Sequence, residues 1–161
     1  MTTRQMTTTN ISLIVGAALT FAMLSTAPSI ASAQAEIATE VTVILAKEEK
    51  GEIDPSLRGV KALQRPPFSS FRSMKVMSRD VGSTKLAKAQ TVKLPNGRVL
   101  QYEVVRKTPD GRFQVKVSIQ SPGKKAFLPL TTIATASDDP FFVANQAHNG
   151  GTLVISIRIG K

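Results

Sequence analysis

Few residues in this chain have side chains suited to acid–base catalysis. His148 is the only histidine, and the sequence contains no cysteine. A Ser-His-Asp triad would have to combine His148 with Ser137 or Ser156 and with Asp138 or Asp139. No Gly-x-Ser-x-Gly nucleophile elbow supports such a triad. His148 lies in the string Gln-Ala-His-Asn-Gly-Gly, which is typical of a turn between strands. The sequence therefore predicts no catalytic residue.

Metal binding has equally little support. Asp138 and Asp139 precede Pro140 and offer carboxylate oxygens of the kind that calcium prefers. Adjacent aspartates are also common in plain turns, where they accept hydrogen bonds from their own backbone. One histidine without cysteine does not make any of the usual zinc sets. We expect no metal and no cofactor. A small envelope hydrolase that uses His148 or the Asp138/Asp139 pair stays open as an alternative.

The distribution of charge is the main indication of function. Residues 58–98 contain ten lysines and arginines and a single acid, Asp80, whereas the whole chain has 21 bases and 11 acids. Basic side chains produce a strong positive field if they gather on one surface. Lys61 and Arg65 are one helical turn apart, but Arg72 and Lys75 should point to opposite faces of a strand. The residues expected to form an anion-binding surface are Arg58, Lys61, Arg65, Arg72, Lys75, Arg79, Lys85 and Lys88.

The amino-terminal residues predict export. An apolar run of about 14 residues, 11–24, is followed by Pro28 and by the small-x-small triplet 31–33. The run is shorter than the roughly 20 residues that a membrane-spanning helix needs. We expect a signal peptide over residues 1–33, cut after Ala33 or alternatively after Ala35. The mature chain would be periplasmic or extracellular, with no transmembrane segment after cleavage.

Export also restricts the choice of partner. The polyanions outside the inner membrane include lipid phosphates, lipopolysaccharide, acidic polysaccharide and acidic protein surfaces. The sequence has no tryptophan and one tyrosine, so stacking platforms for single-stranded nucleic acid are not evident. We therefore expect an anionic envelope component or a protein partner, and no nucleic acid. Lack of cysteine excludes disulfides, so the fold must be stabilised by packing.

The residues of the first half of the expected mature chain predict a strand, then a short helix, then a second strand. We expect a flexible start over residues 34–40 and a single β-rich domain over 41–161, beginning with a buried strand at 41–46. Asp54 can cap a helix that starts at Pro55, with apolar residues at helical spacing, which predicts one short helix near 55–64. A further strand is expected at 71–79.

The second half is dominated by strand patterns. Residues 99–107 and 112–120 alternate in polarity around a Pro-Asp-Gly turn, which predicts an antiparallel hairpin. Pro129 interrupts the next extended stretch and predicts an edge or a bulge there. Residues 152–159 also alternate, with Leu153 and three isoleucines facing inward and Val154 facing outward, as the last strand of a terminal hairpin. The chain is therefore expected to be mainly β, at the margin of α+β: an antiparallel β-sandwich or open barrel with one short helix.

Several short strings occur in an order that resembles small exported bacterial β-rich proteins of unassigned function. These strings are 53–57 with 66–71, then 94–98, then 140–144 with 150–154. The resemblance implies a secreted β-rich domain and transfers no activity. The leading hypothesis is a non-enzymatic exported β domain with a binding or assembly role at the cell envelope, through a basic surface from Arg58 to Arg98. A structural accessory subunit of a secretion or surface assembly is a further alternative.

Overall fold

The computed structural model describes residues 35–121 and 123–160. The expected signal peptide, 1–33, lies outside the described residues. Strands and three short 3-10 helices follow one another in the described part: β1 (Ile37–Lys47), η1 (Pro55–Leu57), η2 (Lys61–Gln64), η3 (Phe68–Ser70), β2 (Ser73–Thr84), β3 (Ala89–Lys93), β4 (Val99–Lys107), β5 (Phe113–Gln120), β6 (Phe127–Thr135), β7 (Phe141–His148) and β8 (Gly151–Ile159).

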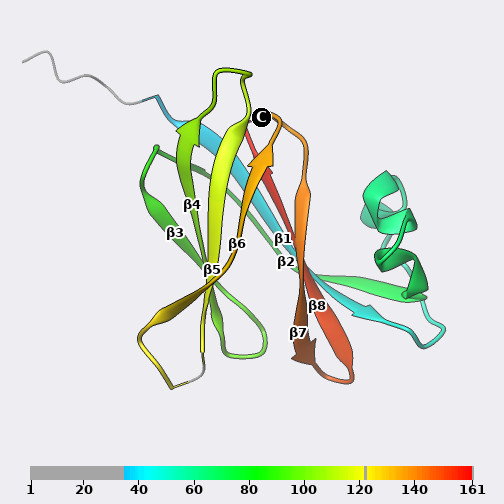
Figure 1. Cartoon of the computed structure of the whole chain (residues 1–161). Helices are drawn as coiled ribbons and strands as arrows, with labels where there is room; N and C mark the ends of the chain where they lie inside the picture. Colours follow the sequence, from blue (N-terminus) through cyan, green and yellow to red (C-terminus); the bar gives the residue numbers. More distant parts are fainter. Residues whose placement is uncertain (1–34, 122, 161) are drawn as a thin grey trace, which may run out of the picture. The chain divides into compact units, whose positions relative to one another are not determined.

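The strands form two four-stranded antiparallel sheets. Sheet A has the order β2-β1-β8-β7, and sheet B has the order β3-β4-β5-β6. The two sheets form separate layers, with β1 and β8 in the middle of sheet A (Figure 1). Among the described residues no strand pairing joins the two sheets into a closed barrel. The expectation of a mainly β protein is confirmed, and a β-sandwich fits.

The main core lies between the sheets. On β4 and β5 the inward residues pair directly, as Leu100 does with Ile119 and Tyr102 with Val117. From sheet A, Val43 and Ile155 pair with each other and are fully buried in the same cluster. Burying a Val, Leu or Ile side chain contributes about 1.5 to 3 kcal/mol. The predicted hairpin of 99–107 with 112–120 is present as β4 and β5, and the predicted terminal hairpin is present as β7 and β8.

A second, smaller core lies on the outer face of sheet A. Ile44 and Val154 pair across β1 and β8 and are 1% exposed. The 3-10 segment, residues 53–71, covers them with Leu57 and Leu63. Figure 1 shows the coils of this segment beside sheet A. The expectation that Val154 faces solvent was therefore wrong, because a covering segment buries both faces of the strand at this point.

The short helix predicted near 55–64 forms two 3-10 turns rather than one α-helix. Asp54 caps the first turn as expected, and its carboxylate accepts a hydrogen bond from the Ser56 backbone N–H at 2.9 Å. Gly59 has a low helix propensity, and the backbone of Val60 is extended. The helix is therefore interrupted in its middle, although Leu57 and Leu63 are buried as their spacing predicts.

Other boundaries differ from the sequence expectations. β1 begins at Ile37 rather than at residue 41, because Thr39 already pairs with both neighbouring strands. β2 continues to Thr84 because it pairs with the whole length of β1. At Pro129 the expectation is confirmed, since β6 is an edge strand and its register shifts between Val117 and Ser118 of β5.

Candidate functional site

The outer face of sheet A changes from apolar to polar along its two central strands. On β1 the outward residues are Ile44 and then, towards the start of the strand, Thr42 and Glu40. The register aligns these positions with Val154, Ser156 and Arg158 of β8. Apolar residues thus pair with each other at one end of the face, and polar residues pair with each other at the other end. The 3-10 segment covers the apolar end.

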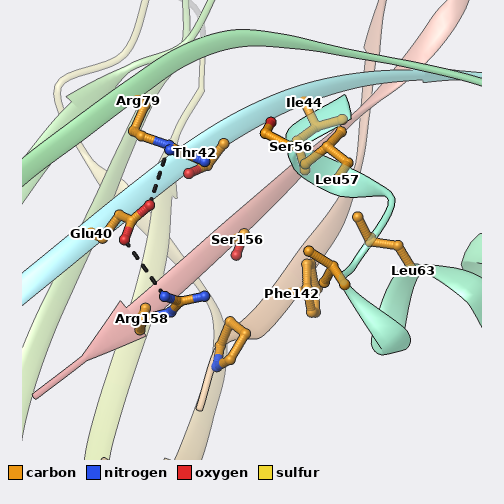
Figure 2. A pocket seen from close by; sticks show the side chains of 12 residues that line it. Glu40, Thr42, Ile44, Ser56, Leu57, Leu63, Arg79, Phe142, Ser156 and Arg158 are labelled. Atoms are coloured by element: carbon orange, nitrogen blue, oxygen red, sulfur yellow. Dashed lines mark ion pairs between the residues drawn. The ribbon is translucent and has the colours of Figure 1, made fainter. Parts of the chain in front are cut away.

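A pocket of about 230 Å³ lies at this boundary. Its apolar lining includes Leu57, Val60 and Leu63 from the 3-10 segment and Phe142 from β7. Figure 2 shows Leu57, Leu63 and Phe142 on one side of the pocket and the charged residues on the other. The volume corresponds to that of roughly seven to eight waters in the liquid, so a small molecule fits.

Three charged side chains form the polar end of the pocket. Glu40 lies between two arginines, with 3.2 Å between its Oε1 and Arg79 Nε and 3.8 Å between its Oε2 and Arg158 Nη1 (Figure 2). The Glu40 side chain is 18% exposed, whereas that of Arg79 is 48% exposed. The hydroxyl residues Thr42 and Ser156 lie between this triad and the apolar wall.

Arg158 has an incompletely satisfied guanidinium. Its Nε is buried and has no hydrogen-bond partner. The nearest carboxylate oxygen recorded for it, Asp138 Oδ1, is 3.8 Å away, which is within ion-pair range and too long for a hydrogen bond. Buried N–H groups normally have partners. This nitrogen has no accessible surface, so a ligand in the pocket would have to contact the other nitrogens of the guanidinium.

The residues that a hydrolase would need lie at opposite ends of β7. His148 ends this strand at the β7–β8 turn, where it pairs with Gly151. Asp138 and Asp139 precede the strand, and Asp138 is in ion-pair contact with Arg158. At about 3.3 Å per residue the strand separates His148 from the aspartates by roughly 25 Å. A triad that combines His148 with Asp138 or Asp139 is therefore not assembled.

No metal-ligand cluster was found either. Among the described residues there is no group of three or more histidine, aspartate or glutamate side chains placed to hold an ion. In the same part of the chain, no helix is long and apolar enough to cross a membrane.

The predicted basic residues are exposed but lie in different places on the fold. The eight basic side chains predicted for the anion-binding surface are all exposed. Arg58, Lys61 and Arg65 belong to the 3-10 segment that covers sheet A. Lys75 and Arg79 lie on β2, where Lys75 pairs with the inward-facing Leu45 and Arg79 with the outward-facing Thr42. The remaining members are Arg72, which precedes β2, and Lys85 and Lys88, in the turn between β2 and β3.

Acidic residues from outside the basic segment approach part of it. The loop before η1 runs beside the start of β2, where Met74 N donates to Glu52 O at 3.0 Å and Asp54 N to Met74 O at 2.8 Å. Glu52 and Asp54 therefore line a shallow hollow together with Arg58 and Lys75. Hydrogen bonds from Ser56 hold the pKa of Asp54 below its usual value, and the charge of Arg79 adds a smaller effect. The fold thus partly neutralises a segment that is strongly basic in the sequence.

No family model, curated protein or solved structure matches this chain. The resemblance to small exported bacterial β-rich proteins stays a prediction. A function can therefore be proposed for this chain only from its own residues and geometry.

Sequence reasoning selected Arg79 but missed its partners in the pocket. The sequence pattern places Glu40 in a flexible start and Arg158 among the alternating residues of the last strand. Both are outward residues that stand opposite each other only because β1 pairs with β8, at the two ends of the described chain. That pairing has no local sequence signal.

Proposed function

We propose that this chain is a non-enzymatic exported binding domain of the bacterial cell envelope. One observation supports this proposal above the others: the exposed basic side chains are largely free of acidic partners. Of the eight predicted residues, Arg79 alone forms an ion pair within 4.0 Å among the described residues. Such side chains are available to an anionic envelope component or an acidic protein surface.

The core of the proposed surface is the 3-10 segment. Arg58, Lys61 and Arg65 are all exposed on it, and Leu57 and Leu63 anchor it to sheet A. A basic segment held by a packed apolar side does not have to be ordered on binding, which lowers the cost of association. Glu52 and Asp54 border this surface near Arg58 and limit its extent on that side.

Binding has better support than catalysis. Where β7 ends, His148 lies far from the aspartates that would orient it. Within the pocket the hydroxyl groups of Thr42 and Ser156 lie beside arginines, whose guanidinium groups stay protonated and cannot act as general bases. The carboxylate that lines the pocket, Glu40, is held in ion pairs with both arginines. The alternative of an envelope hydrolase is for these reasons not preferred.

Export is part of the proposal and has its own test. The apolar run at 11–24 and the triplet at 31–33 carry it. Fractionation of cells that express the full chain, followed by amino-terminal sequencing, should find the protein outside the cytoplasm with Gln34 or Glu36 as its first residue. A cytoplasmic protein that keeps its leader would contradict export.

The binding claim is tested by matched charge reversals. The triple variant Arg58→Glu, Lys61→Glu and Arg65→Glu should bind anionic vesicles or lipopolysaccharide more than tenfold more weakly, since each surface base contributes about 1 kcal/mol at an anionic membrane. The matched control, with the same change in net charge, is Arg106→Glu, Lys116→Glu and Lys125→Glu, all exposed residues of sheet B or its loops. Equal losses in the two variants would show that only net charge matters and would contradict a defined surface.

A second candidate function is that of a structural accessory subunit. It is favoured by β6, an edge strand with no charged residue, on which Leu128 is 54% exposed and Leu130 is 40% exposed. Uncharged edge strands can pair with a strand from another protein. Leu130→Lys should abolish co-purification of an assembly partner under this alternative and leave binding to anionic vesicles unchanged.

A further inference from the structure

We propose that the pocket on the outer face of sheet A binds a small aliphatic carboxylate. The carboxylate would lie against Arg158 and Arg79, and the aliphatic tail against Leu57, Val60 and Phe142. This site is separate from the anion-binding surface of the 3-10 segment, although the segment provides one wall of the pocket.

The charge at the polar end of the pocket favours a ligand with a single negative charge. Arg79, Arg158 and Glu40 together carry one excess positive charge. Asp138 contacts Arg158 from outside the pocket and offsets part of this charge, although its side chain is 58% exposed and its effect is weakened by solvent. One carboxylate on the ligand would balance the triad, whereas a phosphate dianion would exceed it.

The geometry leaves guanidinium donors for such a ligand. Each ion pair with Glu40 uses one nitrogen of each arginine, Nε of Arg79 and Nη1 of Arg158. A guanidinium carries five N–H donors in a planar fork that matches a carboxylate. The Nε of Arg158 is buried and not accessible to a ligand, so the donors that remain are the terminal nitrogens that Glu40 does not use. Glu40 therefore holds both arginines in position without satisfying them.

The apolar wall and the volume of the pocket determine which aliphatic tail the ligand can have. Leu57 and Leu63 are 5% and 4% exposed and are held by the core beneath the segment, so the wall is preformed. The volume of about 230 Å³ fits a chain of medium length and is too small for a two-chain lipid. Thr42 and Ser156 lie between wall and triad, where hydroxyl groups tolerate both parts of an amphipathic ligand.

Calorimetric titration with octanoate, octanol and acetate tests the proposal. Octanoate should bind to the mature chain, and octanol and acetate should each bind at least tenfold more weakly, because each lacks one of the two recognised parts. Equal binding of octanol and octanoate would overturn the assignment of the carboxylate to the arginines. Absence of octanoate binding to the folded protein would overturn the site.

Two variants locate the site. Arg158→Gln should weaken octanoate binding about tenfold to a hundredfold, as expected for loss of a charged hydrogen-bond partner. Arg112→Gln is the control, because Arg112 is also ion-paired with an aspartate but lies in the β4–β5 turn, away from the pocket. Circular dichroism confirms folding of each variant. If Arg112→Gln weakened octanoate binding as much as Arg158→Gln does, the location of the site would be contradicted. If Arg158→Gln fails to fold, the comparison of octanoate, octanol and acetate on the unaltered protein still tests the proposal.

Discussion

Tyr102 gives the clearest spectroscopic signal at the scale of single residues. It is the only tyrosine, and the chain has no tryptophan. Its side chain is buried, and its hydroxyl donates to Thr39 Oγ1 at 3.1 Å. Burial raises the pKa of Tyr102 above its ordinary value, the charge of Asp80 raises it further, and the hydrogen bond with Thr39 opposes both.

The first prediction is that tyrosinate absorbance titrates with a midpoint above pH 10. A raised pKa means that the folded state prefers the neutral phenol, so this contribution to stability is fully present below about pH 10. It is lost as the pH rises through the folded-state pKa. Asp80→Asn should lower the midpoint, and Tyr102→Phe should abolish the absorbance change. A midpoint at or below 10 in the folded protein would contradict the burial of Tyr102.

Gly151 supports a second prediction for a single residue. This glycine begins β8 beside β1, and a Cβ atom placed on it would lie 2.6 Å from the carbonyl oxygen of Ala46. Gly151→Ala should reduce the free energy of unfolding by about 1 to 3 kcal/mol, measured by urea denaturation. Gly82→Ala, where a Cβ would meet nothing within 4 Å, is the control and should change it by less than about 0.5 kcal/mol. Similar losses in both variants would rule out the backbone contact as the cause.

Among the elements, the 3-10 segment has the largest consequences. It forms no α-helix, yet it buries the outer faces of β1 and β8 and provides a wall of the pocket. Its stability therefore comes from packing rather than from helix propensity. Leu57 is 5% exposed and is the residue of η1 that packs into the outer core of sheet A.

The third prediction follows from this packing. Leu57→Ala should cost about 2 to 5 kcal/mol in urea unfolding, because it leaves a cavity under the segment. It should also make the 3-10 segment more sensitive to limited proteolysis than the sheets. Leu128→Ala is the control, since Leu128 is 54% exposed, and it should have little effect. Full protection of the segment in Leu57→Ala would show that Leu57 does not anchor it.

The elements also show which sequence patterns were informative. The hairpin of β4 and β5 could be predicted from the alternating polarity of the two strands and from the Pro-Asp-Gly turn between them, because both patterns are local in the sequence. Val154 belongs to an equally regular alternation and is buried nevertheless. Its burial depends on a segment about 90 residues away in the sequence, which no periodicity within β8 can indicate.

At the scale of the whole molecule, the sandwich places the ends of the described chain side by side. β1 pairs with β8, and this pairing joins Glu40 to Arg158 in the pocket. The fold class could be predicted from local strand patterns, but these functional residues could not, because strand order depends on long-range pairing. The same limitation applies to charge, since the acidic loop at Glu52 and Asp54 folds against a segment that is basic in the sequence.

Net charge is also a property of the whole molecule and supports the proposed function. The full chain carries a formal charge of +10, and the bases of the 3-10 segment are exposed. Attraction to an anionic surface by exposed charges is screened by salt, because the Debye length falls from about 30 Å at 0.01 M to about 8 Å at 0.15 M. Binding through this surface must therefore depend strongly on ionic strength.

Vesicle sedimentation of residues 34–161 tests the proposed function most directly. Vesicles with and without anionic lipid are compared at low and at physiological ionic strength. We expect binding to the anionic vesicles alone, and a fall in affinity as salt is added. Equal binding to neutral vesicles, or binding that does not change across the salt titration, would contradict it.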